Sequence, residues 1–330
     1  MYELVIGAVI AALFFDFLNG FHDAANAIAT IVGTRILRPI QAVTLAAIGN
    51  FTGPFIFGVA VATTVGKGIV DPNIVTVHLI IAGLIGGIVW DIITWLYGLP
   101  TSSSHALIGG LIGAGMASGG IQAIVFEGLN KVLTFMVVSP VVGLAAAFGI
   151  TLLLLHALKW RSPYVINRIF GRLQIASSTF YALTHGANDG QKTMGVITAI
   201  LLAESIIDHF YVPFYVIFMA AAAISLGTFF GGWRIVKTMA FRITNLRPYQ
   251  GFSAETGGGL VLTFMAHFGI PVSTTHAISG AIMGTGATKR LSAVRWGIGR
   301  RIIWAWIITI PASAAISATT YKIMELVGII

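Results

Sequence analysis

The chain has no cysteine and very little charge. Only 9% of its 330 residues are charged, against roughly a quarter in an average soluble domain. The lack of cysteine excludes disulfide bonds, thiolate metal sites and cysteine nucleophiles. Hydrophobic residues make up 57% of the chain, the mean hydropathy is +0.92, and the apolar runs 132–158 and 211–231 reach the ~20 residues that a bilayer-spanning helix needs. The composition predicts an all-α polytopic membrane protein and excludes a soluble enzyme, a nucleic-acid binder and a disordered chain.

The basic residues indicate how the chain is threaded. Apolar spans or hairpins are predicted at about 3–31, 40–64, 74–118, 132–158, 173–203, 211–231, 253–287 and 302–321. Of the 19 lysines and arginines, Lys67, Lys131 and Lys322 then fall on one side with the acidic loop residues, Lys192 lies within a span, and all the others fall on the opposite side. Because lysine and arginine are enriched in cytoplasmic loops, we expect the basic loops in the cytoplasm. The protein would lie in the cell (inner) membrane, with both termini outside.

Two of these segments are predicted to return to the side from which they enter. The charged residues before and after 74–118 fall on the same side of the membrane, which is the outside. Those before and after 253–287 also share one side, which is the cytoplasm. We therefore expect two re-entrant helical hairpins, whose polar breaks at Pro100–Ser104 and Pro271–Thr275 lie deep in the membrane. Non-helical backbone is costly in lipid, so these breaks would be buried in protein or line a watery cavity. An ordinary helix pair with a tight turn at the surface is the alternative.

Two motifs occur twice, in the same order and at nearly the same offset. The pairs are Pro100-Thr-Ser-Ser-Ser-His-Ala106 with Pro271-Val-Ser-Thr-Thr-His-Ala277, and Gly20-Phe-His-Asp-Ala-Ala-Asn26 with Gly186-Ala-Asn-Asp-Gly-Gln-Lys192. This predicts two repeats, which the charge pattern makes opposite in orientation. The first inverted repeat would be 1–158, the second 173–330, and a cytoplasmic basic linker would occupy 159–172. Inverted repeats with broken helices near the membrane midplane are typical of secondary transporters.

The duplicated hydroxyl clusters predict an anion site. Each places three hydroxyl groups just before a new helix begins, where free backbone N–H groups and the helix dipole favour an anion. Two such tips meeting at the midplane would surround a tetrahedral oxyanion, phosphate or sulfate. The six side chains are Ser102, Ser103, Ser104, Ser273, Thr274 and Thr275. The alternative is that the hydroxyl groups only cap their own helices.

Two aspartates within apolar segments predict a cation site beside the anion. An uncompensated charge in such a segment costs at least about 2.5–3.5 kcal/mol, so Asp23 and Asp189 mark an ion pathway or a paired site. Together with the amides of Asn26 and Asn188, they supply the oxygen ligands that Na⁺ needs. A proton on either carboxylate is the alternative.

Four further charged residues lie in or near apolar stretches. Lys192 follows Asp189 by three residues on the same helix face, so it either pairs with that carboxylate or contacts the anion. Glu255, near the start of the second hairpin, is a candidate for an additional cation ligand. Asp16 and Asp91 have no acidic counterpart in the other half. They are either protonated structural residues or part of a water-filled vestibule.

An intramembrane serine hydrolase is the main alternative from another class, because Ser104 is followed directly by His105. Adjacent residues on a helix point in different directions, so this pair is not a nucleophile–base contact. The sequence also has no Gly-x-Ser-x-Gly elbow, no His-Glu-x-x-His and no phosphate loop of the right spacing. We therefore expect no enzyme, and no cofactor apart from a coupling ion.

The repeated motifs resemble the signatures of the PiT inorganic phosphate transporters. They are Gly20-Phe-His-Asp-Ala-Ala-Asn26, His185-Gly-Ala-Asn-Asp-Gly-Gln-Lys192, Pro100-Thr-Ser-Ser-Ser-His-Ala-Leu-Ile-Gly-Gly110 and Pro271-Val-Ser-Thr-Thr-His276. The resemblance covers nearly the whole chain and implies phosphate uptake coupled to Na⁺ or H⁺, two inverted repeats and a homodimer. It also implies that Asp23, Asn26, Asn188 and Asp189 match the family's ion- and phosphate-binding motifs. His22 stands where many members have asparagine.

We therefore expect a symporter that imports inorganic phosphate by alternating access, with Na⁺ favoured over H⁺. A permease for sulfate or another oxyanion is the second possibility. The candidate phosphate ligands are Ser102, Ser103, Ser104, Ser273, Thr274, Thr275, Asp23, Asn26, Gln191 and Lys192, and the candidate Na⁺ ligands are Asp23, Asn26, Asn188, Asp189 and Glu255. The expected partners are phosphate, sodium ions, the lipid bilayer and a second copy of the chain.

Overall fold

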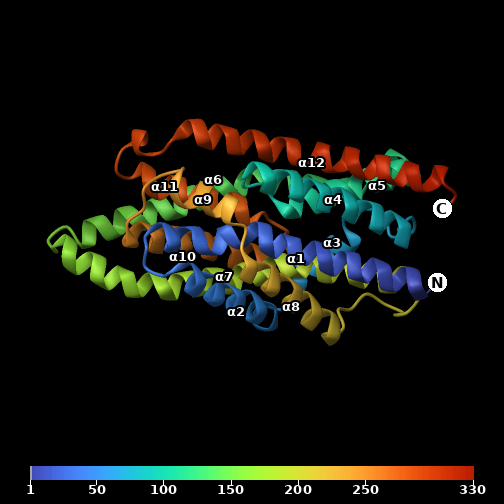
Figure 1. Ribbon diagram of the computed structural model, residues 1–330, viewed down its shortest axis with the longest axis horizontal. Helices are drawn as coiled ribbons and strands as arrows, with labels where there is room; N and C mark the ends of the chain where they lie inside the picture. The colour runs from blue at the N-terminus through green and yellow to red at the C-terminus, as the bar shows by residue number, and fades with distance from the viewer. Residues whose placement is uncertain (1) are drawn as a thin grey trace.

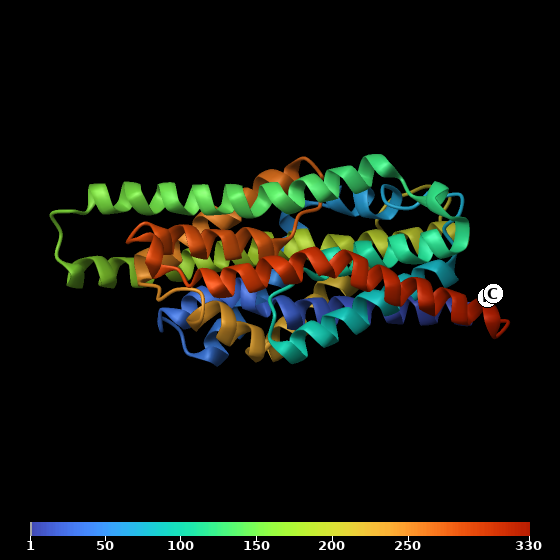
Figure 2. The same ribbon diagram turned by 90° about the horizontal axis from the view of Figure 1, so that it is seen from above.

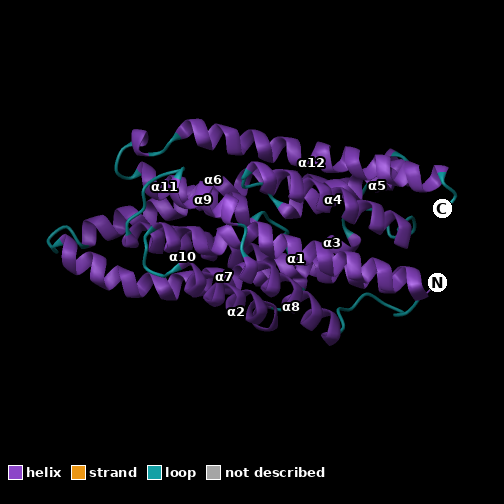
Figure 3. Ribbon diagram, viewed as in Figure 1, coloured by secondary structure: helices purple, strands orange, loops and turns teal. Residues whose placement is uncertain are grey.

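The described part of the chain is a bundle of helices joined by short loops (Figures 1 and 3). The computed structural model describes residues 2–330, except for the side chain of Lys67. The elements are α1 (Tyr2–Gly33), α2 (Pro39–Phe57), α3 (Ala60–Lys67), α4 (Val77–Tyr97), α5 (Ser103–Gly119), η1 (Ile121–Ala123), α6 (Phe126–Ala157), α7 (Pro163–Ala203), α8 (Phe214–Phe230), α9 (Trp233–Phe241), α10 (Pro248–His267), α11 (Thr274–Ala287), η2 (Leu291–Ala293) and α12 (Trp296–Leu326). The prediction of an all-α membrane fold is confirmed.

Five of the described helices are long and apolar enough to cross a membrane: α1, α2, α4, α6 and α12. The pair α8 and α9 passes the same test together, but it is bent by 68° at Gly231 and Gly232. The span predicted at 40–64 is also broken, because α2 ends at Phe57 and Gly58 has a φ of 78°. Hydropathy alone does not detect the break at Gly58, whereas the span predicted at 211–231 ends at the bend between α8 and α9.

The stretch 159–172, predicted as a basic linker, is mostly helical. Helix α7 begins at Pro163, with Ser162 as its N-cap, and it continues without interruption to Ala203. Proline is favoured in the first turn of a helix, where its missing N–H is not needed. The linker between α6 and α7 is therefore much shorter than expected, and Arg168 and Arg172 lie on a helix.

The second half of the chain repeats the element order of the first. Each half begins with a long helix (α1 or α7), followed by a helix and a short helix separated by a break (α2 and α3, or α8 and α9). Two helices joined by a polar break come next (α4 and α5, or α10 and α11), and then a 3₁₀ turn and another long helix (η1 and α6, or η2 and α12). The contacts between the halves are matched as well. Helix α5 of the first half packs on α12 of the second, and its counterpart α11 packs on α6. Likewise, α2 packs on α7, and its counterpart α8 packs on α1. A duplication predicts this order and packing. The opposite orientation of the two halves in the membrane stays a prediction.

In each helix pair, α4–α5 and α10–α11, the chain entering the first helix lies beside the chain leaving the second. Before α4 and after α5 the backbone pairs in an antiparallel bridge between Val70 and Ile124. Before α10 and after α11, the N–H of Arg295 donates to the carbonyl of Ile243 at 2.9 Å. The connection between the two helices of each pair lies near the middle of the long axis of the molecule (Figure 2). Both polar breaks are therefore far from the ends of the bundle.

The two ends of the bundle differ in charge. Both chain termini lie at one end (Figure 1), and the loops around 34–38, 158–162, 242–247 and 288–295, which carry most of the loop arginines, lie at the other. Which end faces the cytoplasm stays a prediction.

Close helix packing depends on glycines at two matched positions. A Cβ on Gly113 of α5 would lie 2.1 Å from the carbonyl oxygen of Ala314 in α12, and a Cβ on Gly284 of α11 would lie 2.3 Å from that of Leu144 in α6. Such distances exclude any larger residue without a shift of backbone. The second helix of each pair is thereby held against the long helix of the other half.

Candidate functional site

The two polar breaks end at helix N-termini with the same cap. The N–H of His105 donates to Ser102 Oγ at 3.3 Å, and the N–H of His276 donates to Ser273 Oγ at 3.2 Å. One hydroxyl group of each cluster therefore caps its own helix, as the capping alternative predicts. The other two hydroxyl groups of each cluster lie in the first turn and are buried.

The two tips meet in the interior. The rings of His105 and His276 are in edge contact, with their centroids 4.7 Å apart. The ring of His276 also stacks on Trp306 at 3.8 Å, and the indole N–H of Trp306 donates to the carbonyl of Pro100 at 2.9 Å. These contacts connect the tip of α5, the tip of α11 and helix α12. The N-terminal ends of α5 and α11 are thus neighbours, as an anion site between them requires.

Both motif aspartates converge on the tip of α11. The hydroxyl of Thr274 donates to Asp189 Oδ2 at 2.9 Å, and the hydroxyl of Thr275 lies 3.4 Å from both carboxylate oxygens of Asp23. The amide of Asn26 donates to Thr275 Oγ1 at 2.9 Å and to Thr274 Oγ1 at 3.2 Å. Helices α1 and α7 therefore bring their motifs to one point, although the two aspartates are far apart in the sequence.

Lys192 joins three parts of the site. Its ammonium group donates to the carboxylate of Asp189, to Ser104 Oγ at the tip of α5, and at 3.0 Å to the carbonyl of Val272 just before α11. The side chain is almost completely buried. The ion pair with Asp189 is thus formed, and the cation is also close enough to the tips to contact an anion between them.

A histidine accompanies each aspartate. His22 Nδ1 lies 2.8 Å from Asp23 Oδ1, and its Nε2 lies 3.1 Å from Thr94 Oγ1. His185 Nε2 lies 3.2 Å from Asp189 Oδ2, and its Nδ1 lies 3.0 Å from the amide oxygen of Asn50. Each ring is therefore oriented by a second polar partner.

Two aspartates and a histidine lie close enough together to share a cation. Asp23, His185 and Asp189 are buried, and one ligand atom of each lies within 4.8 Å of the others. Nearby, the amide oxygen of Asn26 and both side-chain polar atoms of Asn188 are buried without a hydrogen-bond partner among the described residues. Buried polar atoms are normally paired. Free amide oxygens beside two carboxylates suit a hard monovalent cation, which prefers oxygen ligands.

The buried charges of the described residues do not balance. Five carboxylates are buried and only one amine, that of Lys192; the carboxylates belong to Asp16, Asp23, Asp91, Asp189 and Glu255. Each unmatched charge in a membrane core costs at least about 2.5–3.5 kcal/mol, so four would together cost about 10 kcal/mol, as much as the whole stability of many domains. Bound cations or protons would remove this cost by neutralising most of these carboxylates.

Two of the candidate ligands lie away from the tips. Glu255 accepts hydrogen bonds from Thr30 Oγ1 at 2.6 Å, from Gln174 Nε2 at 3.2 Å and from Ser177. This separate polar cluster joins α1, α7 and α10. The side chain of Gln191 accepts a hydrogen bond from the N–H of Val61 at 2.8 Å, so it points toward the start of α3. The structure therefore does not bring Gln191 or Glu255 to the meeting point of the tips.

Several residues of the site were missed by the sequence analysis. Asn50 holds His185 and itself donates to Thr228 Oγ1 at 2.7 Å, while the hydroxyl of Tyr181 donates to the carbonyl of Thr274 at 3.1 Å. Thr30 lies one helical turn after Asn26 and could have been found as another polar residue on the same face of an apolar span. Asn50, by contrast, could be placed only with knowledge of how α2 packs on α7.

The serine–histidine contact of a hydrolase is not formed. Ser104 Oγ accepts a hydrogen bond from Lys192, and no described atom partners His105 Nδ1. The neighbouring histidine instead contacts the ring of His276. The local geometry therefore offers no general base to Ser104 from His105.

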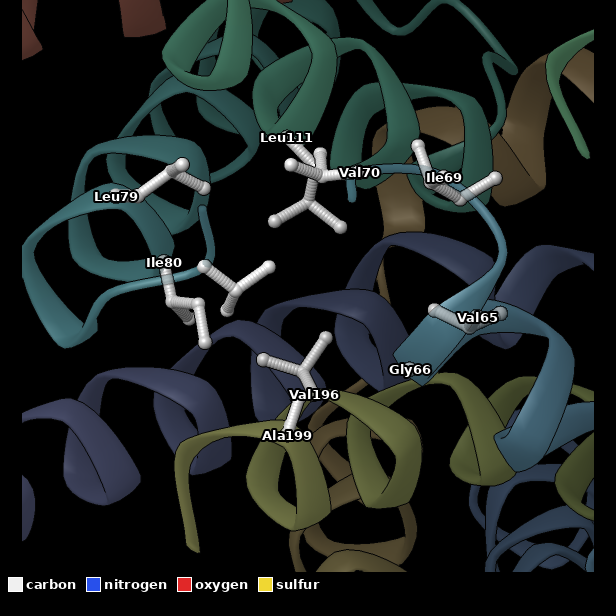
Figure 4. Close-up of a pocket in the computed structure, with 10 residues that line it drawn as sticks. Val65, Gly66, Ile69, Val70, Leu79, Ile80, Leu111, Val196 and Ala199 are labelled. Atoms are coloured by element: carbon white, nitrogen blue, oxygen red, sulfur yellow. The ribbon is translucent and has the colours of Figure 1, made fainter. Parts of the chain in front are cut away.

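One side of the site is closed by apolar side chains. Val196 of α7 lies one helical turn beyond Lys192, and it faces a small cavity that is lined only by apolar side chains and glycine. Figure 4 shows side chains of α3, α4, α5 and α7 pointing toward one another there, including Val65, Leu79 and Leu111. This closure lies toward the end of the bundle that carries the two termini.

Comparisons with known proteins agree with this geometry. The model of the phosphate transporter family matches residues 19–317. The chain belongs to the phosphate transporter family. It is 52% identical over 328 residues to a "Probable low-affinity inorganic phosphate transporter" of Rhizobium meliloti (strain 1021), covering 99% of this chain and 98% of that protein, and 41% identical over 327 residues to a protein of the same description from Bacillus subtilis (strain 168), covering 98% of both.

A solved structure is also similar throughout. "The sodium-dependent phosphate transporter" matches with a TM-score of 0.89 and 26% sequence identity, over 98% of this chain and 99% of that chain. The resemblance to phosphate transporters is thus confirmed, and the expectation of an integral membrane protein that transports phosphate and is not an enzyme is confirmed with it.

Proposed function

We propose that this phosphate transporter imports inorganic phosphate by symport with Na⁺, through alternating access. The observation that carries the proposal is the meeting of two hairpin tips beside two carboxylates and one buried ammonium group. Two helix N-termini and Lys192 offer hydrogen-bond donors and positive charge, which suit a tetrahedral oxyanion. Asp23 and Asp189 would repel the same anion unless a cation neutralises them. One site thus requires both a cation and an anion, which is the basis of symport.

Phosphate would bind between the tips, where Lys192 now contacts Ser104. Ser104, Thr275 and Lys192 are the central ligands of the proposal, together with the N–H groups of the first turns of α5 and α11. Ser102 and Ser273 contribute less, because their hydroxyl groups cap their own helices. Gln191 would contribute only after a movement of α3 releases it from Val61.

Na⁺ would bind on the other side of the carboxylates. Asp23, Asp189 and the unpartnered amides of Asn26 and Asn188 supply its oxygen ligands. Glu255, with Thr30, would hold a second ion nearer the basic end of the bundle. The transporter of similar solved structure is itself described as sodium-dependent, which supports Na⁺ as the coupling ion. A proton on the same carboxylates is the competing coupling ion.

The transport cycle follows from charge balance. Cations neutralise the carboxylates, phosphate then docks between the tips, and only the loaded or the empty site changes sides, since a half-loaded site carries unmatched buried charge. We place the basic loops in the cytoplasm and both termini outside, with α4–α5 and α10–α11 as re-entrant hairpins of two inverted repeats. A homodimer is part of the same proposal.

Uptake of labelled phosphate into proteoliposomes of the purified protein tests the proposal. Three conditions are compared: an inward Na⁺ gradient, an inward proton gradient, and neither. We expect concentrative uptake only with Na⁺. Uptake driven only by protons would show that H⁺ and not Na⁺ is the coupling ion. Uptake of labelled sulfate in place of phosphate would show that sulfate is the substrate.

Matched variants separate the site from general damage. Asp23→Asn and Asp189→Asn keep the size of the side chain and should abolish Na⁺-driven uptake. Asp208→Asn is the control, because Asp208 lies on an exposed loop between α7 and α8 and should leave uptake unchanged. Uptake by both site variants at the level of the control would refute the assignment of these carboxylates.

A further inference from the structure

Asp16 is a buried carboxylate that the proposed transport site leaves unused. It lies on α1 seven residues before Asp23, which corresponds to roughly 10 Å along a helix axis. Its side chain is 0% exposed, and neither carboxylate oxygen has a hydrogen-bond partner among the described residues. Buried charged groups are normally paired or bound to a metal ion. A completely buried carboxylate without a well-formed hydrogen bond is a candidate for binding a ligand.

Two further oxygen atoms in the same condition lie beside it. Asp16 is next to Asn19, one turn along α1, and to Thr193 on the facing helix α7. Asn19 Oδ1 and Thr193 Oγ1 are also buried, and neither has a hydrogen-bond partner in the described part of the chain. Thr193 and Asn19 are thus the polar neighbours of the Asp16 carboxylate, close enough to interact with it but without a well-formed hydrogen bond. This is the arrangement that a bound cation would complete.

We infer that Asp16, Asn19 and Thr193 form an additional Na⁺ site. The ligand atoms are all oxygens, as hard cations prefer. The set holds a single carboxylate, which balances one positive charge and so favours a monovalent ion over a divalent one. Lys192 and Asp189 are the nearest charged groups, and because they pair with each other they do not supply the missing positive charge.

The overall charge supports this inference. Even if one cation is assigned to the pair Asp23 and Asp189 and another to Glu255, the buried carboxylates still outnumber the positive charges. Asp16 and Asp91 remain, and of these Asp91 lies in a pocket that His22 also lines. Asp16 has no histidine beside it among the described residues. A Na⁺ ion there would remove one of the unmatched negative charges near the phosphate.

The position of the site gives it a place in the transport cycle. Thr193 directly follows Lys192, and Val196, one turn further, lines the apolar closure shown in Figure 4. Asp16 therefore lies between that closure and the meeting point of the tips. When the closure opens, this site is the first buried carboxylate on the way to Lys192, so its ion would load before those at Asp23 and Asp189. The inference rests on the Na⁺ coupling proposed above.

Paired fluxes of ²²Na⁺ and labelled phosphate in proteoliposomes test the site. Asp16→Asn should lower the number of Na⁺ ions per phosphate by one, and Thr193→Val should raise the Na⁺ concentration for half-maximal uptake several-fold. Thr198→Val is the matched control on the same helix, because the hydroxyl of Thr198 donates to the carbonyl of Met194 at 2.7 Å and not to the site. It should leave both quantities unchanged.

A second measurement does not depend on transport. The purified protein is unfolded thermally without phosphate while NaCl replaces choline chloride at constant ionic strength. A ligand that binds only the folded state raises its stability with concentration, so Asp16→Asn should flatten the rise of Tm with Na⁺ relative to wild type and Thr198→Val. If Asp16→Asn does not fold, the Na⁺ dependence of Tm is measured on Thr193→Val instead, and it should likewise be flatter than that of wild type.

The outcomes separate this inference from the proposed function. An Asp16→Asn variant with the wild-type ion ratio and the wild-type Na⁺ dependence of Tm would overturn the additional site and leave Na⁺ symport intact. Wild-type uptake that does not respond to Na⁺ would overturn the coupling ion itself, and the additional site with it. That result would be visible before any variant is made.

Discussion

The buried ion pair between Lys192 and Asp189 gives the sharpest prediction. We consider Lys192→Met, which keeps an unbranched chain of similar length but removes the charge and three hydrogen bonds. Removing one partner of a buried pair costs about 3–5 kcal/mol, mainly because the other charge stays buried without compensation. Asp189 would keep a hydrogen bond from Thr274 at 2.9 Å and the nearby ring of His185. Because these partners remain, we expect the free energy of unfolding to fall by about 3 kcal/mol, the lower end of that range. This corresponds to roughly a hundredfold change in the unfolding equilibrium constant.

The double variant Lys192→Met/Asp189→Asn distinguishes the pair from simple loss of packing. Once the carboxylate is neutral, most of the lost stability should return, whereas phosphate uptake should stay abolished in both variants. Stability is measured by unfolding in detergent in choline chloride, because Na⁺ bound at Asp189 would mask part of the effect. The reasoning is refuted if Lys192→Met is as stable as wild type, or if the double variant is less stable than the single one.

Three further predictions concern the tips, the second polar cluster and the helix packing. Thr275→Ala removes a hydroxyl group worth about 1–1.5 kcal/mol, so the phosphate concentration for half-maximal uptake should rise roughly tenfold; an unchanged value would move the site away from this tip. Glu255→Gln keeps the hydrogen-bonded shape but removes the charge, and Na⁺ titrations of uptake should show weaker Na⁺ activation at unchanged phosphate affinity. Gly113→Ala should lower the Tm by an amount equivalent to about 1–3 kcal/mol, because its Cβ would lie 2.1 Å from a carbonyl oxygen of α12, whereas Gly149→Ala meets nothing within 4 Å and should not lower it.

The convergence of the motifs could be predicted from the sequence because each motif was present twice. A hydroxyl cluster after a proline indicates a helix start, and two copies at matched positions suggest that both starts face a common centre. The contacts of Thr274 with Asp189 and of Thr275 with Asp23 agree with this reasoning. The all-α membrane fold also followed from composition, because the bilayer fixes the length of a spanning helix.

The breaks and the side-chain partners could not be predicted in the same way. Hydropathy counts apolar residues but carries no information about direction, so the turn at Gly58 is not visible within the apolar run 40–64. The basic residues at 159–172 favoured a loop, yet Arg168 and Arg172 lie on α7, since charge does not prevent a helix that extends beyond the membrane core. The cluster around Glu255 joins three helices, and its hydrogen bonds depend on packing that no local pattern encodes.

The last residues of the two aspartate motifs explain how a duplicated site can bind one anion. Asn26 and Lys192 occupy matched positions, and each reaches the hairpin tip of the other half: Asn26 bonds to Thr275 of α11, and Lys192 bonds to Ser104 of α5. The geometry is thus shared, but one position holds a neutral amide and the other a cation. Two ammonium groups would balance both Asp23 and Asp189 and so remove the need for a coupling ion between them, whereas two amides would leave the anion without a positive partner. In the proposed mechanism, a single lysine would keep the buried charge negative enough to require cations and would still give phosphate one direct counter-charge.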